Sequence, residues 1–261
     1  MNRYAAILVE IFRRHYQPGI ESFEFERSEI GEVADFLGLN PPKNYGDLLY
    51  YFRFRQPMPK FISDTAPNSL GWIIENAGTR TYRLKLSEIS RVLPRLDLIR
   101  IKVPDSTPEI ISRYALSDEQ ALLAKVRYNR LVDIFLGLTA YSLQNHLRTT
   151  VIGIGQIEID EIYIGLNRNG VHFVIPIQAK GGSDQIGIVQ TSQDVRCCEE
   201  KFPELICRPV SLQFLDDDVI AMFELTLEED RIRVVDEKHY QLVTSEQISH
   251  EDLQRYKIYN G

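Results

Sequence analysis

The sequence predicts an α+β or α/β fold in two parts: N-terminal helices that end in a β-hairpin, and a C-terminal mixed sheet flanked by helices. Three observations favour this. Apolar residues recur at helical spacing in short segments before residue 55. β-branched residues dominate the segments 156–164 and 171–180. Prolines interrupt the region between these patterns, so we expect domains at 1–103 and 104–261.

Length and composition exclude several classes of protein. A chain of 261 residues is long enough to bury two cores. No stretch approaches the roughly 18 consecutive apolar residues of a membrane span, and the N-terminus lacks a signal-peptide pattern. The 3 cysteines suit reduced thiols better than a disulfide framework. We therefore expect a cytoplasmic protein that does not contact a membrane.

The charge is distributed unevenly between the two halves. The net charge of −7 argues against a generic nucleic-acid binder. Residues 1–103, however, hold 15 Lys+Arg and 12 Asp+Glu, a net of +3, whereas residues 104–261 hold 15 and 25, a net of −10. Phosphate contacts are local, so a basic segment such as 43–60 can still bind nucleic acid. The alternative for this segment is an ordinary solvated surface.

The N-terminal elements begin with a helix over 4–16, which Pro18-Gly19 ends. Ser28 is expected to cap a second helix that finishes at Gly38. After a turn rich in proline, a third helix is expected from about 43 to 54. Two helices joined by a short turn with glycine are typical of a helix-turn-helix.

Candidate DNA contacts follow from this pattern. The N-terminal end of the third helix would meet base edges through Lys43, Asn44 and Tyr45. Arg53 and Arg55 lie beyond its middle and suit phosphates. These residues predict double-stranded DNA as the partner.

A β-hairpin is expected next, with strands at 71–75 and 80–84. It would form the wing of a winged-helix domain, with Arg80 near its tip as a further DNA contact. Phe23–Phe25 is expected to be only an extended link. The alternative is a small helical bundle and hairpin that contact no DNA, because a winged helix also serves in protein interactions.

The C-terminal part is expected to alternate helices and strands. A helix from about Asp118 to Phe135 opens with Glu119, which either complements the helix dipole or faces a site as an extra metal-water ligand. The segment 139–150 is polar and is expected to be irregular. The remaining expected elements are a hairpin at 156–180, a helix at 185–201, strands at 206–214, 219–227 and 231–242, and a helix at 249–257.

Charged and amide side chains share one face of the central hairpin. Residues two apart on a strand point the same way, which groups Glu158 with Asp160 and Gln178 with Lys180. Such a cluster on apolar strands is costly unless it is paired or holds a cation. The alternative is a plain cross-strand charge pair.

The order helix, hairpin, helix, strand over roughly 117–215 resembles the PD-(D/E)XK nuclease superfamily. Asp160 matches the acid of its motif and Lys180 matches its lysine. Gln178 stands where Asp or Glu is usual, a departure found in the Mrr-like branch, whose Gln-x-Lys motif is often accompanied by a glutamine in the next helix; Gln190 corresponds to it here.

This resemblance implies a restriction-endonuclease-like C-terminal domain and a Mg²⁺-dependent DNA endonuclease, a site-specific type II restriction enzyme acting as a homodimer. It implies no small-molecule cofactor. The catalytic residues would be Asp160, Gln178, Lys180 and Glu119, and the metal ligands would be Asp160, Gln178, Ala179 and Glu158. The alternative function is a non-catalytic DNA-binding or regulatory protein with a degenerate nuclease fold.

Overall fold

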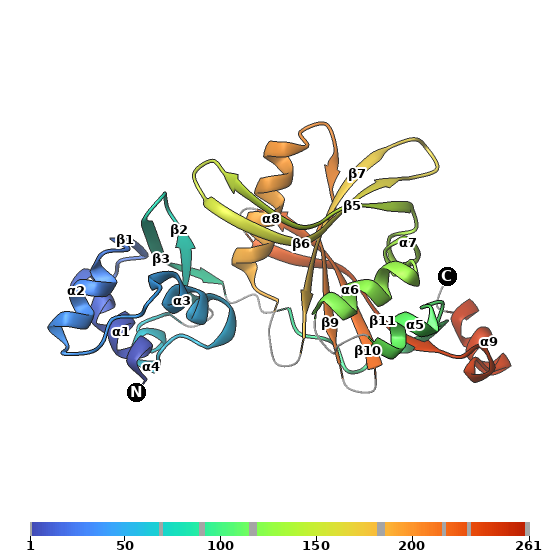
Figure 1. Ribbon diagram of the computed structural model, residues 1–261, viewed down its shortest axis with the longest axis horizontal. Coiled ribbons are helices and arrows are strands. Elements are labelled where there is room, and N and C mark those ends of the chain that lie inside the picture. Colours follow the sequence, from blue (N-terminus) through green and yellow to red (C-terminus); the bar gives the residue numbers. More distant parts are fainter. Residues whose placement is uncertain are drawn as a thin grey trace. The chain divides into compact units, whose positions relative to one another are not determined.

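The computed structural model describes residues 2–67, 70–88, 92–114, 119–181, 186–215, 218–228 and 231–258 (Figure 1). The chain forms two compact units. The first comprises Met1–Arg91, Thr149–Ile157 and Gly187–Gln193, and the second comprises Val92–Arg148, Glu158–Ile186 and Asp194–Gly261. The second unit therefore begins before the boundary expected at residue 103.

The first unit combines short helices with an antiparallel sheet of strand order β1-β3-β2. Its elements are α1 (Arg3–His15), β1 (Ser22–Glu26), α2 (Glu29–Phe36), α3 (Tyr45–Tyr50), the π-helical turn η1 (Tyr51–Arg55), α4 (Lys60–Ser63), β2 (Leu70–Asn76) and β3 (Thr81–Glu88). The core lies between the helices and one face of this sheet, where Phe12, Trp72 and Leu84 are buried.

Two expectations for this unit need correction. Phe23–Phe25 is part of strand β1, because both phenylalanines are buried while the residues between and beside them face outwards and the strand pairs with β3. The third helix begins at Tyr45, and its α-helical part ends at Tyr50, where the chain widens into the π-helical turn. The expected hairpin is confirmed as β2 and β3.

The second unit is built on a mixed sheet whose described strands run in the order β4-β11-β10-β9-β7-β6-β5, with β8 paired to β7. The end of β5, the start of β6 and the start of α8 are grouped with the first unit. The elements are β4 (Arg100–Pro104), α5 (Glu109–Tyr114), α6 (Glu119–Tyr128), α7 (Leu131–Leu136), β5 (Thr139–Val151), β6 (Gly155–Leu166), β7 (His172–Lys180), α8 (Ile188–Lys201), β8 (Ile206–Cys207), β9 (Val210–Phe214), β10 (Val219–Glu228), β11 (Arg231–Val243), the 3₁₀ turn η3 (Ser245–Gln247) and α9 (His250–Ile258).

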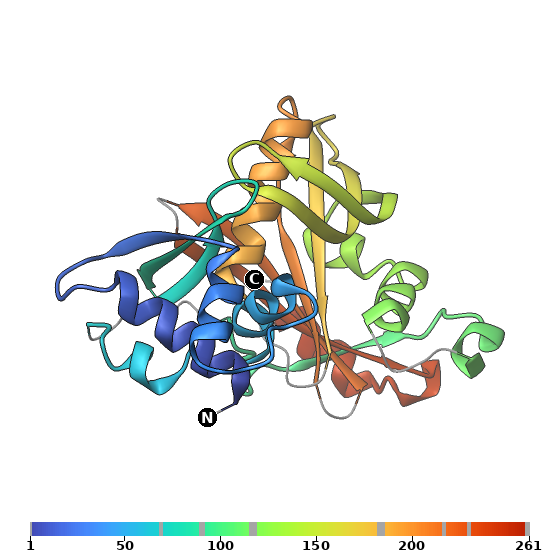
Figure 2. The ribbon, with the colours of Figure 1, turned by 60° about the vertical axis from the view of Figure 1, so that its left-hand side comes forward.

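Strand β7 lies near the centre of this sheet and is covered on both faces. Figures 1 and 2 show α8 on one side of the sheet and α6 with α7 on the other. Ile175, Ile177 and Ala179 pack against the α6–α7 side. The strand β9 runs parallel to β7, so the chain has to cross over between them, and α8 is that crossover. Residues of β7 at even positions therefore face α8.

Some expected elements differ in this unit. The segment 139–150 is the long strand β5, although its side chains are mostly exposed, because it lies at the sheet edge and pairs with β6. The expected helix 118–135 is two helices, α6 and α7, since Arg130 adopts φ 50° and interrupts it. The expected helix starts at Asp118 and Gln185 lie outside the described residues.

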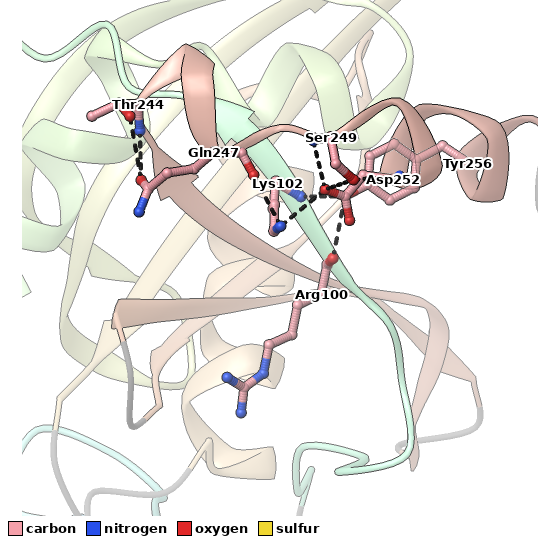
Figure 3. Close-up of polar contacts among 7 residues, drawn as sticks. All are labelled: Arg100, Lys102, Thr244, Gln247, Ser249, Asp252 and Tyr256. Carbon is pink, nitrogen blue, oxygen red and sulfur yellow. Dashed lines mark hydrogen bonds and ion pairs between the residues drawn. The ribbon is translucent and has the colours of Figure 1, made fainter.

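The helix α9 is fastened to the edge strand β4 (Figure 3). The backbone N–H of Lys102 donates to the hydroxyl of Tyr256 at 2.9 Å, and its ammonium donates to the Asp252 carboxylate at 2.9 Å. The Ser249 hydroxyl donates to the same Asp252 oxygen at 2.9 Å. Within the described residues, no helix has the length and apolar character needed to cross a membrane.

Candidate functional site

Strands β6 and β7 bring the central candidate residues together. Their antiparallel register pairs Glu161–Leu166 with His172–Ile177. Just beyond the end of this register, the Asp160 carboxylate accepts the backbone N–H of Ala179 at 2.8 Å. The side chain of Asp160 thus takes the place of a backbone acceptor, and it stands beside Gln178 and Lys180.

The charge state of Asp160 reflects these surroundings. Removal from water raises the pKa of the carboxyl group, and the negative charges of Glu119 and Glu158 act in the same direction. The Ala179 N–H and the Lys180 ammonium act in the opposite direction but do not cancel the rise. The Lys180 ammonium is therefore the positive charge that opposes the rise in the Asp160 pKa.

Glu119 approaches the end of β7 from α6, on the face of the sheet opposite α8. It is the first residue of α6, and a Cβ added at Gly181 would lie 3.7 Å from its Oε1. Gly181 directly follows Lys180 at the end of β7. The Glu119 carboxylate therefore lies at the end of β7 that carries the candidate residues.

Glu158 is occupied by a different set of partners. Its carboxylate pairs with Arg148 Nε at 3.0 Å and with His146 Nε2 at 2.8 Å, both on β5. The cross-strand charge pair considered from the sequence exists, but its cations belong to β5 and not to Lys180. Glu158 raises the pKa of Asp160 through its charge, and its backbone carbonyl accepts from Gln178 Nε2 at 3.3 Å. Its expected role as a metal ligand stays a prediction.

Asp194 is a site residue that the sequence reasoning missed. It lies on α8, is only 2% exposed, and has Asp160, Gln178 and Lys180 close enough to shift its pKa. Burial raises the pKa of Asp194 well above its ordinary value, and the nearby Asp160 adds to this while Gln178 and Lys180 oppose it. The signal in the sequence was an acid between the apolar residues of a crossover helix. Gln190, the expected partner from this helix, lies one turn earlier on α8.

A second buried acid lies on the opposite face of β6. Glu161 is fully buried, pairs with Arg127 of α6 at 3.0 Å, and accepts a 2.5 Å hydrogen bond from the Ser142 hydroxyl. Burial, the largest cause, and the charge of Glu161 raise the pKa of the neighbouring Tyr163 hydroxyl. This cluster fixes α6 against β6 and so helps to place Glu119.

The donor atoms at the end of β7 suit a hard divalent cation. They are a carboxylate oxygen from Asp160, an amide oxygen from Gln178 and the backbone carbonyl of Ala179, and Mg²⁺ prefers oxygen ligands. Among the described residues, Asp194 Oδ1 is buried without a hydrogen-bond partner, a sign of a polar space beside these donors. The described part of the chain contains no cluster of three or more His, Cys, Asp or Glu residues placed to hold a metal ion.

The first unit contains a basic groove at the start of α3. A cavity of about 590 Å³ is lined by Arg27, Ser28, Pro42, Lys43, Asn44, Tyr45 and Arg80. The expected contacts Lys43 and Arg80 are both exposed there, and Arg27 joins them from the end of β1. The three cations share one concave surface, which is the charge distribution that a phosphate backbone requires.

Asn44 and Tyr45 line this groove but have structural partners. The Asn44 carbonyl oxygen accepts from the Gly46 N–H and from Arg27, both at 3.0 Å, so it caps α3 and orients Arg27. The Tyr45 ring packs over α2, because a Cβ added at Gly31 would lie 2.3 Å from its hydroxyl. Both side chains thus help to shape the groove, and their contacts with base edges stay a prediction.

The two arginines expected at phosphates have other positions. Arg53 donates to the Asn76 side chain at 3.3 Å, and burial lowers the pKa of its guanidinium to about 10. It joins η1 to the hairpin and is not presented to solvent as a phosphate contact would be. The backbone of Arg55 ends η1, and its side chain lies outside the described residues.

The chain thus carries an acid, an amide and an ammonium at one end of β7, and a basic groove in its first unit. Compared with known family models, curated proteins and solved structures, this chain matches none of them.

Proposed function

We propose that this protein is a Mg²⁺-dependent DNA endonuclease of the site-specific restriction type. The observation that carries the proposal is the meeting of Asp160, Gln178 and Lys180 where strands β6 and β7 end their register. The order α6, β5–β6–β7, α8, β9 follows the order on which the resemblance to the PD-(D/E)XK superfamily rests. The parallel pairing of β7 with β9 brings the Lys180 end of β7 beside Gln213.

The residues of the site have separable roles in phosphodiester hydrolysis. A bound divalent cation would supply a water of lowered pKa and would neutralise charge at phosphorus. Asp160 provides a charged ligand oxygen, and Gln178 and the Ala179 carbonyl provide neutral ones. Lys180 orients the attacking water and stabilises the extra negative charge that develops on the phosphate. Glu119 supplies a further acceptor for water at the end of β7.

Recognition of double-stranded DNA is assigned to the first unit. Its order α1-β1-α2-α3-η1-α4-β2-β3 and its three-stranded sheet support a winged-helix domain. The start of α3 and the hairpin turn, which such a domain presents to DNA, carry Lys43 and Arg80. Arg27 extends the same basic surface. Cutting both strands of a symmetric site would require two active sites, so we propose a homodimer as the active form.

A second candidate function is a DNA-binding or regulatory protein that does not cleave. The observation that favours it is the pairing of the Glu158 carboxylate, one of the expected metal ligands, with Arg148 and His146. With Gln178 neutral, Asp160 is then the charged ligand on the β6–β7 face. This candidate keeps the basic groove and assigns the acid cluster to stability alone.

Incubation with supercoiled plasmid separates the two candidates. The wild-type protein in Mg²⁺ is expected to linearise or fragment the plasmid at discrete positions, and a chelator is expected to stop the reaction. A gel-shift assay in Ca²⁺ or chelator measures DNA binding on the same preparation. Binding without any cleavage over a range of plasmids, including methylated ones, would favour the non-catalytic candidate.

A further inference from the structure

Strand β5 changes the face of the sheet to which its side chains point. Residues an even number apart share one face of a regular strand. Ser142 donates to Glu161, which lies on the face of β6 that α6 covers. Arg148 is an even number of residues further on, but it contacts Glu158, which lies on the opposite face from Glu161. The alternation of β5 is therefore broken between Ser142 and Arg148.

The break coincides with a strained residue, His146. Its φ of 55° is a left-handed conformation that residues with a Cβ seldom adopt. Irregular positions of this kind change the direction of side chains in strands and are frequent beside active sites. Here the His146 imidazole reaches Glu158 at 2.8 Å from Nε2, and the Arg148 guanidinium reaches it at 3.0 Å from Nε. The irregular backbone thus brings both basic side chains to one carboxylate.

This carboxylate lies on the face that carries the proposed cation site. Glu158 and Asp160 are two residues apart on β6, so their side chains point the same way. Strand β5 is the neighbour of β6 in the sheet, and neighbouring strands lie about 4.8 Å apart. The Arg148 side chain therefore lies one strand away from Asp160, on the same face of the second unit.

Arg148 presents its guanidinium to solvent. Its side chain is 61% exposed and that of Glu158 is 41% exposed, so the arginine forms the outer part of the pair. A guanidinium carries five N–H donors in a planar fork, which matches the oxygens of a phosphate. The contacts among the described residues involve Nε, which donates to Glu158, and Nη2, which lies 3.3 Å from His146 Nε2. Arg148 therefore has both the exposure and the donors for a phosphate contact.

The charge of the C-terminal part gives such a contact a purpose. Residues 104–261 hold 15 Lys+Arg and 25 Asp+Glu. An acidic surface repels the phosphate backbone, so DNA needs local cations where it passes the cation site. Lys180 supplies one at the end of β7, and Arg148 supplies another from β5.

We propose that Arg148 binds a phosphate of the DNA strand next to the phosphate that is cut, and that Glu158 and His146 are positioning residues that hold its guanidinium there. The inference rests on the proposed function, because it places the cut beside Asp160. It gives the ion pair of Glu158 a role in substrate binding, and it adds a DNA contact in the second unit to the basic groove of the first.

The salt dependence of DNA binding tests the contact without cleavage. The probe is a labelled plasmid fragment that the wild type shifts in a gel, and fluorescence anisotropy in chelator measures its affinity for the intact protein. R148A is expected to reduce the slope of log affinity against log salt by about 1. The matched control is R233A on β11, since Arg233 is 65% exposed and pairs with Glu228 at 3.2 Å. Its slope is expected to equal that of the wild type, and an unchanged slope for R148A overturns the contact.

Two further variants separate a direct contact from its alternatives. The double variant R148A/E158Q has the net charge of the wild type. A slope that stays reduced in it supports the contact, whereas a return to the wild-type slope means that an unpaired Glu158 repels DNA and overturns the proposal. H146G suits the left-handed backbone and keeps Arg148. It is expected to weaken binding less than R148A does, with the wild-type slope, and wild-type affinity in H146G overturns the positioning role of His146.

Cleavage of modified duplexes tests where Arg148 binds. Once the cut has been mapped, an uncharged methylphosphonate replaces one flanking phosphate at a time. One such replacement is expected to lower kcat/KM for the wild type and for R233A, and to have no further effect on R148A, which has already lost the contact. Independent effects at every flanking phosphate overturn the placement beside the cut. A wild type that binds DNA without cutting it overturns the proposed function and this placement, while a reduced slope for R148A still supports the phosphate contact.

Discussion

The side chain of Asp160 accepts the Ala179 backbone N–H at 2.8 Å, a position that a backbone carbonyl occupies in an uninterrupted sheet. This single bond fixes the carboxylate to the strand that carries Gln178 and Lys180. It also draws the Ala179 peptide into the site, since the N–H and the carbonyl belong to the same residue. The acid of β6 and the polar residues of β7 are thus joined directly, without an intervening side chain.

Asp160→Asn is expected to reduce cleavage by about 10²- to 10³-fold, because it removes the charged ligand oxygen. The same variant is expected to be more stable than the wild type at pH 7. The pKa of Asp160 is raised in the folded protein, chiefly by desolvation, so the ionised group opposes folding at any pH above that pKa. The penalty fades as the pH falls toward the unfolded value of about 3.9.

Urea unfolding at pH 7 and at pH 4 measures this effect. The midpoints of the wild type and the asparagine variant should differ at pH 7 and approach each other at pH 4. Asparagine still offers an oxygen to the Ala179 N–H, so the backbone contact is retained. A variant that is less stable than the wild type at pH 7 would show that the charge of Asp160 stabilises the fold.

Lys180→Ala is expected to reduce cleavage by about 10²- to 10⁴-fold while DNA affinity stays nearly unchanged. In the proposed function the ammonium acts on the attacking water and on the developing charge, whereas the first unit supplies the affinity for DNA. Single-turnover cleavage and gel shift on the same preparation provide the two measurements. The control is Lys238→Ala on β11, which removes an ion pair with Asp236. Cleavage by the Lys180 variant at the wild-type rate would remove this residue from the site.

Local pattern was sufficient to predict the central hairpin and the grouping of Asp160, Gln178 and Lys180. Strand alternation is a property of neighbouring residues, so it can be read from the sequence. Asp194 could not be placed in this way, because its position near Gln178 depends on where a crossover helix lies on the sheet. The same limit applies to Glu158, whose partners come from β5, a segment without the alternation that marks a half-buried strand.

For the basic groove, too, the sequence predicted some residues correctly and misplaced others. The sequence predicted Lys43 and Arg80 as DNA contacts on two different elements, and the structure places both in the lining of one groove. Arg53 was also predicted to contact DNA, because it is basic and lies in the same segment. The π-helical turn instead directs its side chain toward Asn76 and away from solvent. A departure from regular helix geometry changes the direction of every later side chain, and residue type alone does not reveal it.

Arg80→Ala is expected to weaken DNA binding and to reduce the slope of log affinity against log salt by about 1, because one phosphate contact is lost. Fluorescence anisotropy over a series of salt concentrations measures that slope. Arg83→Ala is the matched control, three residues further along the chain on β3. Its guanidinium is already paired with Glu24 at 2.6 Å and with Glu75 at 3.1 Å, so its loss should leave the slope unchanged. Equal slopes for the wild type and the Arg80 variant would exclude Arg80 from the DNA contact.

The ion pair that holds α9 against β4 is expected to be lost as the pH falls from about 4 to about 2. The hydrogen bond from Lys102, followed by those from Ser249, lowers the pKa of Asp252 to about 2 (Figure 3). A lowered pKa means that the stabilisation is fully present above the unfolded value of about 3.9 and is lost as the pH falls through the folded one.

Hydrogen exchange of the β4 amides, followed by mass spectrometry, would report this release. The Lys102 N–H, which donates to Tyr256, should exchange slowly at pH 5 and lose protection at pH 2.5 after correction for the intrinsic rate. Asp252→Asn should show the unprotected behaviour at both pH values, because it lacks the charge that Lys102 binds. Asp236→Asn is the control, since Asp236 pairs with Lys238 away from β4. Equal protection of the wild type at pH 5 and pH 2.5 would mean that the tyrosine and apolar contacts hold α9 without the ion pair.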